Sequence, residues 1–311
     1  MSFLSVEKRI NFGRETIIPM IKVYTLLQVL IRMNSNIILS EYGESIRSTF
    51  KVNSNNPNSL PVLICARNEE EKLPKLLYSL AMQTYPVQPI IIDNASTDST
   101  AKVAEDLGCI VIEETKPGLI FALKKGFSYF NDNNETRPIL LTDADTIPVN
   151  TWAEKLQNQS NRLFDSNGGQ LFGPVFYYGR SLIGLMKTIY FSHYKDRVAY
   201  KNKFIKARGP NAILIPDDKQ KILESLACKM DESVVTGTDE LVKDTVADSG
   251  GSLDRTWDVS ATVFSSYDRP ILLKAFIKAI LSAGDFSRDQ YQDWYQSRPN
   301  GIKYIAHKQN V

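Results

Sequence analysis

The sequence predicts an α/β fold with a doubly wound, mostly parallel sheet flanked by helices, and with a helical N-terminal extension. Continuous apolar runs alternate with helical patterns roughly every 25 residues, which is the rhythm of a parallel sheet. Polar clusters follow these runs, where such sheets bind ligands. The 311 residues, 43% of them hydrophobic, are enough to bury the core of a full-sized domain.

Four short apolar runs predict strands buried on both faces, because such strands lack polar alternation. They span residues 60–66, 88–93, 109–112 and 138–143, and residues 73–80, 101–107 and 122–130 between them have helical spacing. In the second half we expect extended segments at 168–176, 209–216 and 257–264. We also expect helices at 182–194, 238–250 and 271–282, the last basic and amphipathic.

Charge and cysteine content exclude several classes of protein. The 37 basic and 35 acidic residues nearly balance, which gives no reason to expect nucleic-acid binding. Cys65, Cys109 and Cys228 are widely spaced and predict free buried thiols in a reducing compartment. Charged and polar residues interrupt the apolar stretch 16–39, so we expect helices packed on a cytoplasmic protein, with peripheral membrane contact as the alternative.

Two carboxylates follow the fourth apolar run, in Asp143-Ala-Asp145. On an extended backbone residues i and i+2 share a face, so both can point into one crevice. Oxygen ligands of this kind suit Mg²⁺ or Mn²⁺ and leave room for phosphate oxygens. A turn with two solvated aspartates is the alternative. No GxGxxG follows the first strand and no Walker A lysine loop occurs, so a nucleotide would bind in another way.

Three motifs in order resemble the family 2 glycosyltransferases of GT-A fold: residues 61–70 (PVLICARNEE), 90–100 (IIIDNASTDST) and 140–145 (LLTDAD). The resemblance is strong over 60–150 and traceable to 265. It implies a glycosyltransferase domain at 57–265, with 57–150 as its nucleotide-binding half and 151–265 as its acceptor half. Residues 1–56 are a helical extension and linker, and the polar stretch of the linker, residues 51–59, runs into the domain. Residues 266–311 form an amphipathic helix and tail.

The resemblance also implies roles for individual residues. Asp143 and Asp145 would hold a divalent metal that bridges the donor diphosphate, with His307 as a weaker candidate for a third ligand. The residues expected to bind the nucleotide are Ala66, Arg67, Asn68, Glu70, Asp93, Ser96 and Asp143. Where the family often has lysine the chain has Leu119, and Lys116 or Lys124 would have to substitute. Without the resemblance, residues 94–100 are an ordinary helix cap.

The second half would supply the acceptor site and a base. An inverting transfer needs a carboxylate to take the proton of the acceptor hydroxyl. The resemblance assigns this role to Asp239, with Glu240 as the alternative. If neither residue is catalytic, both are explained as acidic side chains that stabilise the N-terminus of a helix. It also places Gly209, Pro210, Asn211 and Glu240 beside donor and acceptor.

Together these observations predict a metal-dependent hexosyltransferase-like enzyme that transfers a sugar from a nucleotide-diphosphate donor, expected to be a UDP-sugar, with inversion. The cofactor would be Mn²⁺ or Mg²⁺, and the acceptor a saccharide, a lipid-linked molecule or a small molecule. A retaining transferase of the same fold and an inactive sugar-nucleotide-binding scaffold are the alternatives. A nucleotidyltransferase would have a basic, glycine-rich loop where this chain has the acidic segment 66–71.

Overall fold

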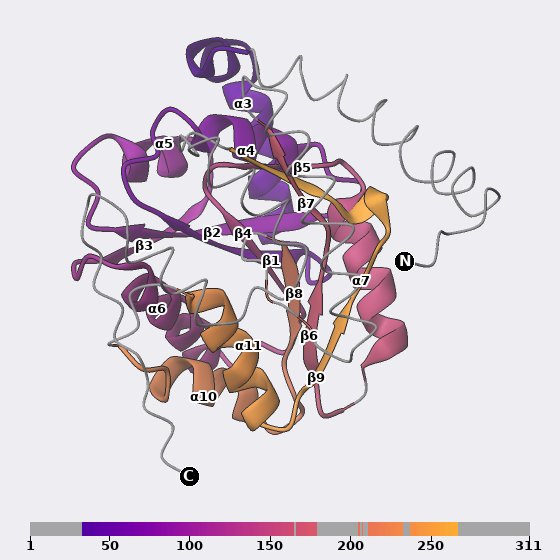
Figure 1. The fold of residues 1–311 in the computed structure, drawn as a ribbon. Helices are drawn as coiled ribbons and strands as arrows, with labels where there is room; N and C mark the ends of the chain where they lie inside the picture. Colours follow the sequence, from indigo (N-terminus) through magenta and orange to yellow (C-terminus); the bar gives the residue numbers. More distant parts are fainter. Residues whose placement is uncertain are drawn as a thin grey trace, which may run out of the picture.

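The described part of the chain is built around a twisted seven-stranded sheet in the order β3-β2-β1-β4-β8-β6-β9 (Figure 1). The computed structural model describes residues 33–164, 166–178, 205, 207, 211–232 and 237–266. The strands are β1 (Leu60–Ala66), β2 (Val87–Asn94), β3 (Ile110–Glu114), β4 (Ile139–Asp143), β6 (Gly169–Phe172), β8 (Ala212–Ile215) and β9 (Ser252–Arg255). Only β8 runs antiparallel to its two neighbours, so the predicted mostly parallel sheet is confirmed.

Helices cover both faces of this sheet (Figure 1). The helices are α3 (Ser35–Ser54), α4 (Leu73–Ala81), α5 (Thr100–Asp106), α6 (Leu119–Asp132), α7 (Trp152–Leu163), α10 (Lys221–Cys228) and α11 (Thr238–Asp248). Alternate residues of β2 lie in two separate hydrophobic cores. Ile91 packs with α3, α4 and α7, whereas Ile90 and Ile92 pack with α6, α10 and α11. Each face of the apolar strands is therefore covered, as their composition predicts.

The described part of the N-terminal extension belongs to the domain core. Ile38, Ile46 and Phe50 of α3 are almost fully buried in the same cluster as β1 and β2. The helix runs to Ser54, so the polar linker expected at 51–59 is shortened to residues 55–59. Polar residues at 51–54 lie in the last helical turn, where Asn53 donates a hydrogen bond from Nδ2 to the Val87 carbonyl. The predicted packing of this segment on protein is confirmed for these residues.

A second, three-stranded sheet forms where the sequence pattern was weakest. It contains β5 (Thr146–Pro148), β7 (Val175–Tyr178) and β10 (Val263–Ser266), in the order β5-β10-β7. The single strand expected at 257–264 is wrong, because the 3-10 helix η3 (Val259–Ala261), capped by Asp258, separates β9 from β10. Likewise, the segment expected at 168–176 splits into two strands at Gly173-Pro174.

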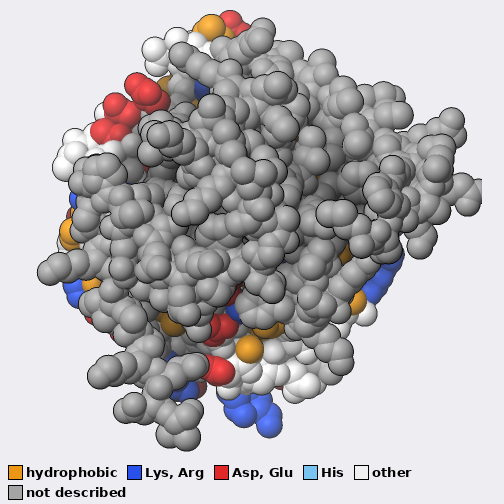
Figure 2. All heavy atoms as spheres, viewed as in Figure 1, with side chains coloured by type: hydrophobic (Ala, Val, Ile, Leu, Met, Phe, Trp, Pro, Cys, Tyr) orange, Lys and Arg blue, Asp and Glu red, His pale blue; other side chains and the backbone are white. Residues whose placement is uncertain are grey.

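Some expectations concern residues outside the described part, among them the helices at 182–194 and 271–282. Within that part, no helix is long and apolar enough to cross a membrane. All three cysteines are free, but Cys228 is exposed rather than buried as expected, because it ends α10. Described acidic and basic side chains both appear along the face in Figure 2, consistent with the balanced charge.

Candidate active site

The loops after β1 and β2 are bound to each other by side chains from the first two motifs. Ala66 and Asp93 end neighbouring parallel strands, in register with one another. The Asn68 backbone N–H donates to Ser96 Oγ at 3.0 Å, and the Thr97 N–H donates back to Asn68 Oδ1 at 2.8 Å. Asn68 adopts a positive φ of 55°, which asparagine tolerates better than most residues. The structure therefore brings these predicted residues together.

Glu70 and Asp98 complete this loop pair. Asp98 Oδ2 accepts from the Glu70 N–H at 3.3 Å, while Glu70 Oε2 accepts from the Ser99 N–H at 2.8 Å. Thr100 donates to Asp98 Oδ1 from its N–H and its hydroxyl. Burial opposes ionisation of Asp98, but these hydrogen bonds outweigh it and lower its pKa. Asp98 thus accepts from the N–H of Thr100, the first residue of α5, although the N-cap itself is Ser99, whose side chain makes no cap bond. The same carboxylate also orders the first loop.

Asp93 takes no part in the hydrogen bonds between these two loops. Its side chain is only 8% exposed, and Oδ1 has no hydrogen-bond partner in the described structure. Such an atom is costly to bury and is usually paired in native proteins. An external donor at the end of β2 would satisfy it. Arg67, by contrast, is exposed.

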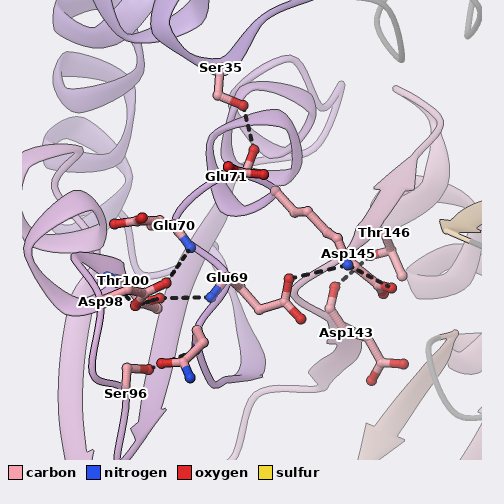
Figure 3. Close-up of polar contacts among 12 residues, drawn as sticks. Ser35, Glu69, Glu70, Glu71, Ser96, Asp98, Thr100, Asp143, Asp145 and Thr146 are labelled. Carbon is pink, nitrogen blue, oxygen red and sulfur yellow. Dashed lines mark hydrogen bonds and ion pairs between the residues drawn. The ribbon is translucent and has the colours of Figure 1, made fainter. Parts of the chain in front are cut away.

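The two aspartates after β4 lie beside Glu69 (Figure 3). Asp143 ends the strand and residues 144–145 form a turn, so the extended geometry expected for this motif is wrong. Thr146 closes the turn by donating to the Asp143 carbonyl at 2.8 Å. Lys72 Nζ lies 3.6 Å from Glu69 Oε2 and 4.0 Å from Asp145 Oδ2, so it joins these two carboxylates.

Asp143 and Asp239 line one narrow recess. Water reaches the Asp143 side chain, but the crowded walls reduce its hydration and raise its pKa to about 8. The negative charges of Asp239, Asp145 and Glu69 raise the pKa further. Asp239 lies in the first turn of α11, more than 90 residues along the chain from Asp143 (239 against 143). The structure therefore brings the predicted base next to the predicted metal motif.

The remaining walls of this recess are mostly apolar. They are formed by Leu63, Cys65, Leu119, Leu123, Leu141, Phe172 and Val242, together with Thr142 and Gln170. Leu119, at the start of α6, is 44% exposed. The side chain that stands where the family often has lysine is therefore an apolar wall here.

Lys116 and Lys124, the two suggested substitutes for that lysine, both pair with Glu232. Lys124 Nζ lies 2.7 Å from Glu232 Oε1, and Lys116 Nζ lies 3.2 Å from Oε2. Lys116 also lies 3.7 Å above the Phe121 ring. Asn94 holds the preceding loop by donating to the Lys116 carbonyl and accepting from the Gly118 N–H. The two lysines thus join this loop to the segment after α10.

Asn211 and Glu240, which are predicted to lie beside the sugar donor and the acceptor, form hydrogen bonds within the protein instead. Asn211 is fully buried; Oδ1 accepts from Trp152 Nε1, and Nδ2 donates to the Pro174 and Ala261 carbonyls. Its amide therefore ties β8 to the smaller sheet and is not available to a ligand. Glu240 accepts from the Ala207 N–H and from Lys243 Nζ. Gly209, Pro210 and His307 lie outside the described residues.

The donor set at the end of β4 suits a cation shared with a ligand. Within the described residues, no three His, Cys, Asp or Glu side chains are grouped to hold a metal by themselves. Mg²⁺-type sites often use one or two carboxylates and take further oxygens from phosphates and water. Asp143 and Asp145 meet that requirement, and the repulsion around Asp143 is the kind that a cation relieves.

The fold is that of the GT-A class, with a mostly parallel sheet and aspartates at its carboxyl edge. Residues 62–207 match the family model described as Glycosyl transferase family 2. The resemblance found in the sequence is confirmed over these residues.

Curated relatives match over short stretches. The 4,4'-diaponeurosporenoate glycosyltransferase of Staphylococcus haemolyticus is 47% identical over 57 residues, which cover 18% of this chain and 15% of the relative. Its Staphylococcus aureus (strain bovine RF122 / ET3-1) counterpart is 43% identical over 58 residues, covering 19% and 16%. The match thus spans about a sixth of the length of these relatives.

A solved structure shares the fold. S. aureus TarS in complex with UDP superimposes with a TM-score of 0.50 at 16% identity, covering 75% of this chain and 68% of that one. The likeness at this identity concerns the arrangement of the backbone.

Sequence reasoning missed Glu69 and Lys72, although both stand in the acidic segment that follows β1. Lys72 joins Glu69 to Asp145, which follows a strand more than 70 residues later (145 against 72). The run of three glutamates at 69–71 was the available signal, but it does not show which carboxylate faces the metal motif.

Proposed function

We propose that this chain transfers a sugar from a UDP-sugar donor to an acceptor hydroxyl, with inversion at the anomeric carbon and with help from Mn²⁺ or Mg²⁺. The observation that carries the proposal is that Asp143 and Asp239 line one recess, with Asp145 close enough for its charge to raise the pKa of Asp143, in a chain that matches this family. TarS, which shares the fold, is known in complex with UDP.

In this proposal the loops that follow β1 and β2 hold the nucleoside. The unpaired Oδ1 of Asp93 accepts a hydrogen bond from the base, which supplies the donor that this buried atom lacks. Asn68, Ser96 and Asp98 keep the two loops in place through their mutual hydrogen bonds, and Ala66, Arg67 and Glu70 line the nucleoside site.

Asp143 and Asp145 hold the divalent cation together with the diphosphate. When bound, the cation supplies electrostatic stabilisation of the departing diphosphate. Lys72 keeps Asp145 paired with a positive charge in the metal-free protein. These residues thereby lower the cost of grouping several negative charges around the phosphates.

Asp239 acts as the base that removes the proton from the acceptor hydroxyl. It is better suited than Glu240, because Glu240 is committed to Lys243 and to the Ala207 N–H. The apolar walls around Asp143 and Asp239 limit water at the reacting carbon, which disfavours hydrolysis of the donor. Product stereochemistry, measured by NMR, separates inversion from the retaining alternative.

Thermal stability with UDP, GDP, CDP and TDP, each with and without Mn²⁺, tests the donor site. We expect UDP with Mn²⁺ to raise Tm, and the rise to disappear with EDTA and in Asp145→Ala. Asp106→Ala is the matched control, since Asp106 is an exposed carboxylate of α5 that pairs only with Lys102 among the described residues. A protein that responds to no nucleotide would refute the proposal, whereas a protein that binds a nucleotide but transfers no sugar would favour the inactive scaffold.

A further inference from the structure

A second cavity opens at the opposite, amino-terminal edge of the sheet. It has a volume of about 370 Å³, within the size range of small-molecule sites. Pro61 near the start of β1 lines it, whereas Ala66 ends β1 on the side of the proposed donor site. At ~3.3 Å per residue, five residues along β1 separate the two sites by about 16 Å.

The floor of this cavity contains an unsatisfied polar group. Gln88 of β2 is 6% exposed, and its Oε1 has no hydrogen-bond partner in the described structure. Ile90 and Phe130 beside it are also buried, so the amide stands in an otherwise apolar floor. A buried amide oxygen of this kind calls for a donor from outside the protein.

The other amides of the cavity present acceptors as well. Asn53 donates from Nδ2 to the Val87 carbonyl, and Asn133 donates from Nδ2 to the Tyr129 carbonyl. Both hydrogen bonds use the NH₂ group of the amide, so the carbonyl oxygen of each amide can accept from a ligand. With Gln88, amide side chains from β2, α3 and the end of α6 therefore line one space.

The one ion pair of the lining leaves the cavity without net charge. Arg137 donates to Glu135 from Nε at 2.9 Å and from Nη2 at 2.6 Å, and its Nη1 donates to the Ser59 carbonyl. An anion would have to compete with Glu135 for Arg137, and an ammonium group would find no unneutralised carboxylate in the lining. An uncharged ligand with several hydroxyl donors fits best.

We propose that this cavity binds a saccharide unit, at a site separate from the proposed donor site. The amide oxygens of Gln88, Asn53 and Asn133 accept hydrogen bonds from sugar hydroxyls. The partly exposed Tyr129 ring supplies apolar contact for the C–H surface of the sugar, and the buried Phe130 ring, with its centre 5.7 Å away, packs beside it. This inference goes beyond the proposed transfer reaction and does not depend on it.

Saturation-transfer NMR on the full chain with glucose, N-acetylglucosamine and maltose tests the site, with spermidine as a cationic probe. We expect at least one saccharide to bind, and binding to persist with saturating UDP and Mn²⁺. Gln88→Leu should weaken it about tenfold or more, because a hydroxyl then faces an apolar surface. The same variant should keep or raise Tm, since it removes an unsatisfied buried amide.

Tyr129→Leu is a second variant that should weaken binding through loss of the ring face. Three results with the wild-type chain would overturn the proposal: no saccharide signal, displacement of the saccharide by UDP and Mn²⁺, or binding of spermidine alone. An unchanged signal in both variants would overturn it as well. The UDP-induced rise in Tm should stay intact in Gln88→Leu, so failure here is distinct from failure of the transferase proposal.

Discussion

The pKa of a carboxylate is shifted in opposite directions at the two ends of the central sheet. At the carboxyl edge, reduced hydration and the charges of Asp239, Asp145 and Glu69 raise the pKa of Asp143 to about 8. At the amino edge burial also opposes ionisation of Glu135, but the hydrogen bonds and charge of Arg137 outweigh it and lower the pKa of Glu135. The carboxyl edge therefore has more negative than positive side chains and suits a cation. At the amino edge Arg137 neutralises Glu135, so that edge suits an uncharged ligand.

Helix α6 connects the two edges. Leu119 and Leu123 in its first half line the catalytic recess, and Tyr129 and Phe130 in its second half line the amide cavity. The same helix packs on β1 and β2 between the sites. The sites thus differ in chemistry but share one rigid wall, and variants can be chosen that affect one edge, the other, or the wall.

The largest effect is expected at the carboxyl edge, for Asp239→Asn. Loss of a general base typically costs about 10²–10⁴ in rate. We expect kcat for sugar transfer to fall by that factor while the UDP–Mn²⁺ rise in Tm remains, since Asp239 is assigned to the acceptor proton and not to the nucleotide. Steady-state rates with a UDP-sugar and thermal melts of the same protein check both parts.

Glu240→Gln is the matched control for that variant. Both residues are carboxylates in the first turn of α11, but Glu240 is bonded to Lys243 and to the Ala207 N–H. We expect it to lower stability slightly and to leave kcat within about tenfold of the wild type. If Glu240→Gln lost as much activity as Asp239→Asn, the assignment of the base would be wrong.

The sequence predicted the first half of the fold better than the second. Leu60–Ala66 and the following strands are continuous apolar runs, whose burial requires no knowledge of distant residues. The smaller sheet depends on Val263–Ser266 pairing with residues near 147 and 176, and local periodicity does not encode such pairing.

The same division applies to the candidate sites. The spacing of Asp143 and Asp145 identifies them as candidate site residues, and the resemblance indicates Asp239. Gln88 did not stand out, because a glutamine at the start of an apolar strand looks like a boundary residue. Only the arrangement of α3, α6 and β2 around its side chain shows that its amide oxygen is buried without a partner.

The next largest effect is expected in the shared wall, for Gly126→Ala. A Cβ at Gly126 would lie 2.4 Å from Leu63 Cδ1 and 3.3 Å from Ile92 Cγ1, where α6 packs closely on the sheet. Overpacking of this kind costs about 1–3 kcal/mol. We expect chemical denaturation to show that loss, and both UDP and saccharide binding to weaken because α6 must shift.

Ser128→Ala, two residues further along α6, is the control for a change of side chain in the same helix. It removes one hydroxyl from a partly exposed position and should leave stability within about 0.5 kcal/mol. If Gly126→Ala weakened binding at one edge only, α6 would not act as a common wall, and the two sites would be structurally independent.

The smallest effects are opposite in sign at the two edges and concern stability against pH in the metal-free protein. The pKa of Asp143 is raised, so its ionisation opposes folding increasingly as pH rises from about 4 to about 8. Asp143→Asn should therefore gain stability relative to the wild type across that window, by on the order of 0.5–1 kcal/mol after solvent screening. The pKa of Glu135 is lowered, so its stabilisation is present above about pH 4.3 and is lost as pH falls.

Glu135→Gln should accordingly be less stable than the wild type at neutral pH, by up to about 1 kcal/mol for this partly exposed pair, and the difference should shrink in acid. Urea unfolding at pH 3.5, 6 and 8 in EDTA compares the two variants (about one point in each regime). Parallel pH profiles for Asp143→Asn and Glu135→Gln would mean that the contrast between the edges is wrong. Profiles that diverge as pH rises would tie it to two carboxylates, one repelled by its neighbours and one held by Arg137.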